Sequence, residues 1–272
     1  MPRLGLRKWY QDLALEGTVV GDQKRNEFLN DLESVLGDVR SIWLPGRLNT
    51  TTTTDASRFA YAWTYDATIA TRFAVLGSGA SVDFNGTTQE ADTPDNDRYS
   101  FGNSAVDQPF SIVALVNPDT VNAVRTIVAK WDETTATPLR EWWFYMDATG
   151  FPSLELWDES ADGQIGREDQ IALTASTWVL LGATYDGSSA NTGIQLYKNA
   201  SRVDDTNVSS GTYTAMENSA TLPTLAFHIG AAATEEFWDG RMGLVALTAK
   251  VLSVDEWWEI KELCNGFFDL SL

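Results

Sequence analysis

The sequence has few of the residue types on which several common functions depend. Its 272 residues include one cysteine and one histidine, and 19 Lys and Arg stand against 38 Asp and Glu, a formal net charge of −19. The single cysteine, Cys264, excludes an intramolecular disulfide framework, and one His with one Cys cannot form a His/Cys zinc site. The shortage of basic residues argues against a nucleic-acid partner and against docking on an anionic membrane.

Long apolar runs and familiar catalytic motifs are also absent. No stretch approaches the ~18 apolar residues of a membrane span. The first twelve residues interrupt their apolar positions with charge, unlike a secretory signal, so we expect a protein made in the cytosol that is moved by something other than a signal peptide. There is no phosphate-binding glycine loop and no Gly-x-Ser-x-Gly motif.

The charge is unevenly divided along the chain. Residues 1–50 hold seven basic and seven acidic residues, which leaves 12 basic and 31 acidic residues for the other 222. This division predicts three parts. Residues 1–50 form an N-terminal helical and extended anchor, 51–78 a threonine-rich linker and extended arm, and 79–272 the main domain.

The N-terminal part contains one amphipathic pattern. Between Asp22 and Gly37 apolar residues recur at helical spacing, with Asp22 able to cap the start and Gly37 able to end the helix. A single helix cannot form a core, so this stripe must meet the main domain or another chain. We interpret it, with the apolar segment that follows, as an assembly anchor formed by Phe28, Leu29, Leu32, Val35, Leu36 and Trp43.

From about Ser81 onward, short strand-like runs alternate with turn residues, which indicates an antiparallel sandwich. One clear helix closes the chain: Ser253 and Glu256 form a capping box before an apolar stripe that includes Cys264, which we interpret as a small buried hydrophobe.

A family resemblance emerges from the order of several motifs over roughly residues 80–265. These are the runs Ser81–Gly86, Phe110–Pro118, Thr126–Trp131, Trp143–Gly150, Trp178–Gly187, Ile194–Asn199, His228–Gly230, Asp239–Leu247 and Val251–Trp257. In this order they resemble the strands and turns of laminin-G-like domains in the concanavalin A-like lectin/glucanase superfamily. The resemblance implies an all-β fold: a two-sheet antiparallel jelly-roll sandwich, here with an N-terminal partly helical segment and a short C-terminal helix.

Two departures from the family pattern bear on cofactors and catalysis. Gly243 stands where the last strand of the family usually has an Asp that helps to hold a structural calcium, so we expect no metal and no cofactor. Retaining glucanases of the superfamily carry paired carboxylates on one strand. The nearest counterpart here, Glu155 with Asp158 and Glu159, has Trp157 at a carboxylate position. We interpret these three acids as the solvated end of a hairpin. We expect the protein not to be an enzyme.

Sugar binding needs flat aromatic side chains on an exposed face, and the chain has 11 Trp. Along 140–147, Trp142, Phe144 and Met146 share one face of a strand, and Trp143 and Tyr145 share the other. One face must enter the core. The other is either a ligand surface or packs on another segment or subunit. The candidate ligand-binding residues are Trp143, Tyr145 and Trp157.

A lectin-like domain without a signal peptide suits a phage particle, whose proteins assemble in the host cytoplasm. The leading hypothesis is a non-enzymatic structural or adhesion subunit of the virion, in a tail, fibre or capsid decoration. Its partners would be other virion proteins, copies of itself as a homo-oligomer, and a host-surface glycan. The alternative is a carbohydrate-binding module of a bacterial surface or secreted protein.

Overall fold

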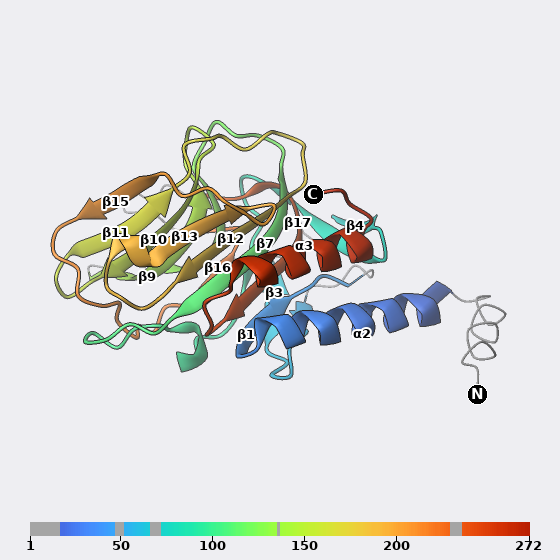
Figure 1. Ribbon diagram of the computed structural model, residues 1–272, viewed down its shortest axis with the longest axis horizontal. Helices are drawn as coiled ribbons and strands as arrows, with labels where there is room; N and C mark the ends of the chain where they lie inside the picture. Colours follow the sequence, from blue (N-terminus) through green and yellow to red (C-terminus); the bar gives the residue numbers. More distant parts are fainter. Residues whose placement is uncertain (1–16, 47–51, 66–71, 135–136, 229–235) are drawn as a thin grey trace.

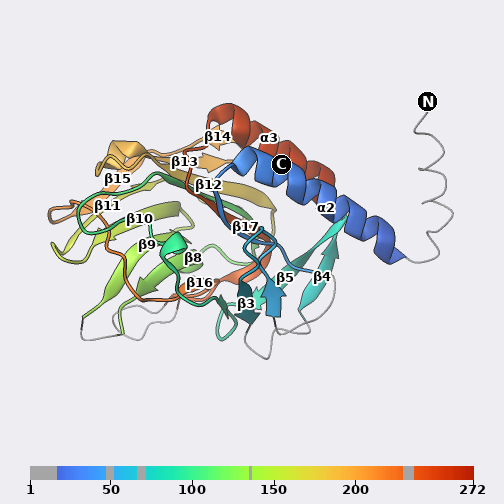
Figure 2. The ribbon, with the colours of Figure 1, turned by 90° about the horizontal axis from the view of Figure 1, so that it is seen from below.

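The chain forms two antiparallel sheets packed face to face, with two helices on the outer side of one of them (Figures 1 and 2). The computed structural model describes residues 17–46, 52–65, 72–134, 137–228 and 236–272. The predicted antiparallel sandwich with one helix near each end is confirmed over these residues. None of the described helices is both long enough and apolar enough to cross a membrane.

Sheet A lies beneath the helices. Its strands follow the spatial order β14 (Ser201–Arg202), β13 (Ile194–Lys198), β12 (Val179–Tyr185), β7 (Phe110–Pro118), β17 (Asp239–Thr248), β5 (Gly79–Asn85) and β4 (Phe73–Leu76), and β1 (Val39–Trp43) also pairs with β17.

Sheet B forms the other half of the sandwich. Its spatial order is β15 (Thr206–Ser210), β11 (Gly163–Glu168), β10 (Pro152–Asp158), β9 (Leu139–Met146), β8 (Arg125–Asp132), β16 (Pro223–Leu225), β6 (Ala91–Asp92), β3 (Ala62–Tyr65) and β2 (Thr52–Thr54). Two single-turn 3₁₀ helices, Asp97–Tyr99 and Asn191–Gly193, connect strands.

The middle strands of sheet A are buried on both faces, which explains their continuous apolar sequence. In β7, Ile112, Ala114 and Val116 point into the core between the sheets, whereas Val113 and Leu115 belong to a second core beneath the helices. Strands covered on both sides read as unbroken apolar runs instead of alternating ones.

The second core is formed largely by α2 (Gly17–Leu36) and α3 (Val254–Phe268), which run side by side over sheet A (Figure 2). Phe28 of α2 stacks on Phe267 of α3 with ring centroids 4.3 Å apart. The Trp257 ring of α3 reaches the sheet at Gly182, where any side chain would collide with it. The capping box of Ser253 and Glu256 is present as predicted. Cys264 is fully buried, as predicted.

The anchor interpretation of the apolar stripe needs correction. Most of its side chains are buried against the chain's own α3 and sheet A, and Trp43 lies between the two sheets, where its indole N–H donates to the Tyr65 hydroxyl. The stripe therefore completes the sandwich and leaves little apolar surface for an assembly partner. The residues concerned are Phe28, Leu32, Val35 and Leu36, with Leu29 packed at their edge.

The predicted anchor, linker and main domain are not separate units in the structure, because all three contribute strands to the two sheets. The predicted anchor contributes β1, which pairs with β17, and the predicted linker contributes β2 and β3 at the edge of sheet B. Trp63 and Tyr65 of β3 are buried in the core between the sheets. Residues 1–16, 47–51 and 66–71, which belong to the predicted anchor and arm, lie outside the described residues.

Candidate ligand-binding face

The outer face of β8–β11 in sheet B gathers the candidate aromatic residues, and no described helix covers it (Figure 2). Alternation in β9 sends Trp142, Phe144 and Met146 into the core, as predicted. The opposite side of the same strands, joined by His228 from the segment after β16, carries a set that we call the aromatic face: Tyr145, Trp143, His228, Trp131 and Trp157.

The rings of the aromatic face form a continuous row. Tyr145 stacks on Trp143 with centroids 3.7 Å apart and planes 13° from parallel. On the far side of this pair His228 lies 4.4 Å from the Trp143 ring. Trp131 is 5.7 Å from both Trp143 and Trp157, which extends the row towards the end of β10. Trp143 and Trp157 are half-buried, so part of each ring faces solvent.

A β-bulge brings Arg140 to this face, beside Trp131. Lys130 pairs with Trp142, but the next residue, Trp131, pairs with Arg140, so Glu141 is an extra residue in β9. Trp131 and Arg140 therefore both point outward, and the Arg140 guanidinium lies 3.7 Å from the centroid of the Trp157 ring. Alternation along β8 places Trp131 outward, two residues after Ala129, but simple alternation along β9 would direct Arg140 into the core.

Polar groups fix the rings in place. The Trp143 indole N–H donates to Thr126 Oγ1 at 2.9 Å, and the Trp131 indole N–H donates to Glu133 at 2.9 Å. Arg140 donates to both oxygens of Glu159, at 2.6 and 2.9 Å. A surface held by hydrogen bonds loses little conformational entropy when a ligand stacks on it.

Glu155 lies beside Trp143 on the neighbouring strand, 8% exposed, and accepts a hydrogen bond of 2.5 Å from the Tyr145 hydroxyl. Burial raises the pKa of Glu155, and the hydrogen bond from Tyr145 offsets only part of this effect. Further carboxylates raise the pKa in the same direction: Glu168, Glu133 and Glu236.

His228 is 2% exposed and contributes both a ring and an unused polar atom. Its Nδ1 lies 3.1 Å from a Glu236 carboxylate oxygen. Its Nε2 is buried and has no hydrogen-bond partner among the described residues. Native proteins rarely leave such an atom unpaired, so a ligand hydroxyl is a natural partner for it.

The three sequence candidates thus lie on one surface, and the sequence missed four further members. These are Trp131, His228, Arg140 and Glu155. The prediction that Glu155, Asp158 and Glu159 are all solvated is wrong for two of these three acids. Glu155 is buried, and Asp158 is buried as an acceptor for backbone amides, including that of Thr214.

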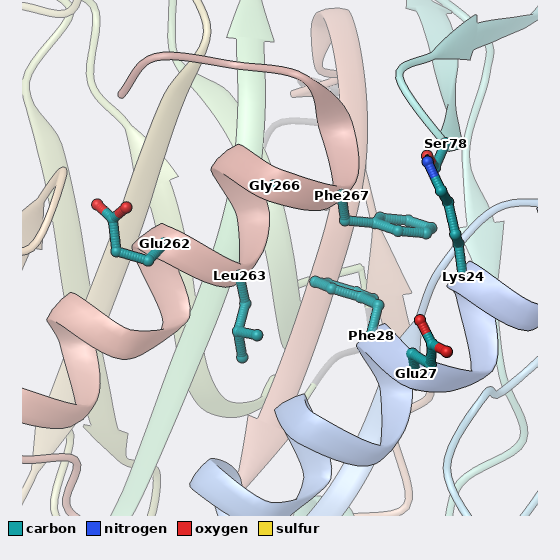
Figure 3. Close-up of a pocket in the computed structure, with 8 residues that line it drawn as sticks. All are labelled: Lys24, Glu27, Phe28, Ser78, Glu262, Leu263, Gly266 and Phe267. Carbon is teal, nitrogen blue, oxygen red and sulfur yellow. The ribbon is translucent and has the colours of Figure 1, made fainter. Parts of the chain in front are cut away.

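A hollow of about 290 Å³ lies elsewhere, between α2 and α3 (Figure 3). Phe28 and Phe267 face each other there, and charged side chains from both helices, Lys24, Glu27 and Glu262, surround them. The apolar wall is already a stacked pair, so the hollow offers few unmet contacts. Within the described part of the chain, no group of three or more His, Cys, Asp or Glu side chains is arranged to hold a metal ion.

Comparison with known families agrees with the fold. A family model described as the concanavalin A-like lectin/glucanases superfamily matches residues 85–256, more than half of the chain. No curated protein sequence matches.

Several solved structures share the architecture. The binding domain of Paraclostridial Mosquitocidal Protein 1 has a TM-score of 0.58 and 10% identity, covering 84% of this chain and 52% of that one. Domain 4 of AbnA, a GH43 extracellular arabinanase from Geobacillus stearothermophilus solved with arabinotriose, has a TM-score of 0.57 and 13% identity, covering 82% and 98%. The binding domain of botulinum neurotoxin serotype D has a TM-score of 0.53 and 11% identity, covering 85% and 52%.

At these identities the likeness shows the fold alone. The chain spans about half the length of the two toxin binding domains. All three of these structures are described as binding domains or as domains solved with a bound sugar.

Proposed function

Because this chain belongs to the concanavalin A-like lectin/glucanase superfamily, we propose that it is a non-catalytic, lectin-like module that binds a glycan on its aromatic face. The observation that carries the proposal is the Tyr145–Trp143 stack on the outer side of sheet B. Tyr145 and His228 cover the two faces of the Trp143 ring, so an apolar edge of a sugar ring can lie against the part of Trp143 that stays exposed, and sugar hydroxyls can meet the polar atoms beside it. The known sugar complex of an AbnA domain with this fold supports the proposal.

The carboxylates on this face support binding without hydrolysis. A retaining glycosidase needs two carboxyl groups about 5–5.5 Å apart on either side of the bond that it cleaves. Beside Glu155 on β10, the next outward position is Trp157, and Glu159 beyond it is held by both of its oxygens to Arg140. Glu155 therefore has no partner carboxylate on its own strand that is free to act.

The test is a titration of neutral, amino and acidic oligosaccharides into the wild-type protein and a Trp143→Ala variant, followed by isothermal calorimetry. Loss of the stacking ring should weaken binding by at least about tenfold, which corresponds to ~1.4 kcal/mol. Trp258→Ala is the matched control, because Trp258 is 48% exposed on α3, over the opposite sheet. Equal affinity of the Trp143→Ala and wild-type proteins, or no binding to any glycan, would refute the proposal.

As the setting of this activity we propose display on a phage particle, in contact with other virion proteins. The strong negative charge supports it, since like charge keeps many displayed copies soluble. Any attachment must use surfaces other than the stripe buried against α3. The protein should then sediment with density-purified particles and be protected there from protease. If it is found only free, or as a module within a secreted polypeptide, the alternative of a bacterial carbohydrate-binding module holds.

A further inference from the structure

The cations on the strands of the aromatic face are all engaged by acids. The strands β8–β11 carry four Lys and Arg residues, and each forms an ion pair with a carboxylate. The pairs are Arg125–Asp239, Lys130–Glu141, Arg140–Glu159 and Arg167–Asp204. Residues 229–235, whose structure is not described, add one Glu and no cation to this part of the sequence.

Two carboxylates on the same face have no such partner. Glu155 and Glu168 form no ion pair among the described residues; Glu155 accepts from Tyr145, and Glu168 from Ser153. Glu155 of β10 pairs with Gly166 of β11. Glu168 lies two residues beyond Gly166 on β11, so its side chain is on the same face of the sheet as that of Glu155. They are close enough for the charge of Glu168 to raise the pKa of Glu155.

The side chain of Glu155 packs directly over a glycine of the neighbouring strand. A Cβ at Gly166 would lie 3.0 Å from Cγ of Glu155 and 2.8 Å from the carbonyl oxygen of Leu154. Glycine at position 166 therefore lets the Glu155 side chain lie over β11, on the same face as Glu168. A buried carboxylate without a cation is costly, and a cationic ligand group would relieve that cost.

We propose that the aromatic face selects sugars that carry a positively charged amino group, such as glucosamine, over neutral sugars, and excludes sialic and uronic acids. This inference rests on the proposed function and names its ligand class. The sugar ring lies against the exposed part of Trp143, and its ammonium group meets the carboxylates of Glu155 and Glu168. The buried, unpaired Nε2 of His228, 4.4 Å from Trp143 by ring centroid, is available to a hydroxyl of the same sugar.

The experiment compares four ligands by calorimetry at pH 6: a glucosamine tetramer, the matching N-acetylglucosamine tetramer, a glucose tetramer and sialyllactose. The glucosamine tetramer should bind at least about tenfold tighter than either neutral tetramer, and sialyllactose should not bind. The double variant Glu155→Gln/Glu168→Gln should reduce this preference to about threefold or less while it still binds the neutral tetramers.

Two controls separate a site from general attraction to an acidic protein. Glu259→Gln removes one charge from an exposed position on α3 and should leave the preference unchanged. Trp143→Ala keeps every carboxylate and should lose the glucosamine tetramer. If that variant still binds it with wild-type affinity, the attraction is non-specific and the inference is wrong.

The remaining outcomes distinguish a failure of the amino-sugar selectivity from a failure of the proposed glycan-binding function. Equal affinity for amino and neutral tetramers, both lost in Trp143→Ala, overturns the amino-sugar selectivity and leaves the proposed function standing. Binding of sialyllactose as tight as that of the glucosamine tetramer overturns the selectivity as well. If none of the four ligands binds, the proposed function and the inference both fail.

Discussion

The ion pair of Lys130 and Glu141 offers the sharpest test of how the aromatic face is held. Both side chains are fully buried, with Lys130 Nζ 2.6 Å from a Glu141 oxygen. The ammonium group also donates to Ser100 Oγ at 2.9 Å and to the carbonyl oxygen of Ser219 at 2.6 Å. Glu141→Gln preserves the shape of the side chain and an acceptor for Lys130, but it removes the negative charge.

The expected cost follows from what remains around Lys130. Breaking a buried ion pair by removing one partner costs about 3–5 kcal/mol. Asp95 lies 3.1 Å from Lys130 Nζ at the edge of this cluster, with a side chain 28% exposed, and remains as an ion-pair partner, so the cost should fall near the lower end, at about 3 kcal/mol. That is a large part of the ~5–15 kcal/mol that stabilises most domains. Urea denaturation followed by Trp fluorescence measures it.

A second variant tests the reasoning. Lys130→Met/Glu141→Gln no longer buries an ammonium without its carboxylate, so it should unfold at a higher urea concentration than Glu141→Gln alone. Glu259→Gln, exposed on α3, is the matched control and should stay within about 0.5 kcal/mol of the wild type. The single variant Lys130→Met completes the comparison. A loss below about 1 kcal/mol for Glu141→Gln, or a loss in the double variant equal to the sum of the losses in Glu141→Gln and Lys130→Met, would show that the buried charges do not depend on each other.

Three further predictions test the core and the site. Burial raises the pKa of Glu155 in the folded state, so ionisation of this group costs stability as the pH rises above the ordinary Glu pKa of about 4.3. In urea denaturation, Glu155→Gln should therefore gain stability relative to the wild type between pH 4 and pH 7. The opposite trend would contradict the raised pKa of Glu155. Gly182→Ala places a methyl group 2.1 Å from the Trp257 ring and should destabilise the protein by about 1–3 kcal/mol, seen as a lower Tm; an unchanged Tm would contradict the close packing of α3 on sheet A. Phe28→Ala should cost about 3–5 kcal/mol in urea denaturation because Phe28 stacks on Phe267 inside the chain, whereas a side chain that only anchors the protein to a partner would cost the isolated chain little.

The fold could be predicted from the sequence wherever one periodicity dominates. Turn residues between short apolar runs indicated the antiparallel sandwich, and the Ser253–Glu256 capping box indicated α3. The role of the Phe28 stripe could not be predicted, because an amphipathic face shows that a helix is covered and does not say what covers it. Its cover is Phe267 and Phe268, more than 200 residues away in the sequence.

The sequence predicted the site residues of β9, but it did not predict which residues from other segments join them. Alternation along β9 put Trp143 and Tyr145 on the face opposite the core, and the structure agrees. His228 joins them from a different part of the chain, just after β16, and no local pattern links it to Trp143. Glu155 looked solvated because acids usually are. Its burial depends on Tyr145, whose hydroxyl reaches it across the strands.

The bulge at Glu141 connects the stability of the sandwich to the composition of its aromatic face. A shift of one residue in a strand sends each following side chain to the opposite face. Without the extra residue, alternation from Trp142 would direct Glu141 outward and Arg140 into the core. With it, Glu141 turns inward to Lys130, and Arg140 turns outward over the Trp157 ring. The ion pair fills the inner side of the bulge that re-aims Arg140. Glu141→Gln should therefore weaken glycan binding as well as stability, although Glu141 itself faces away from the aromatic rings.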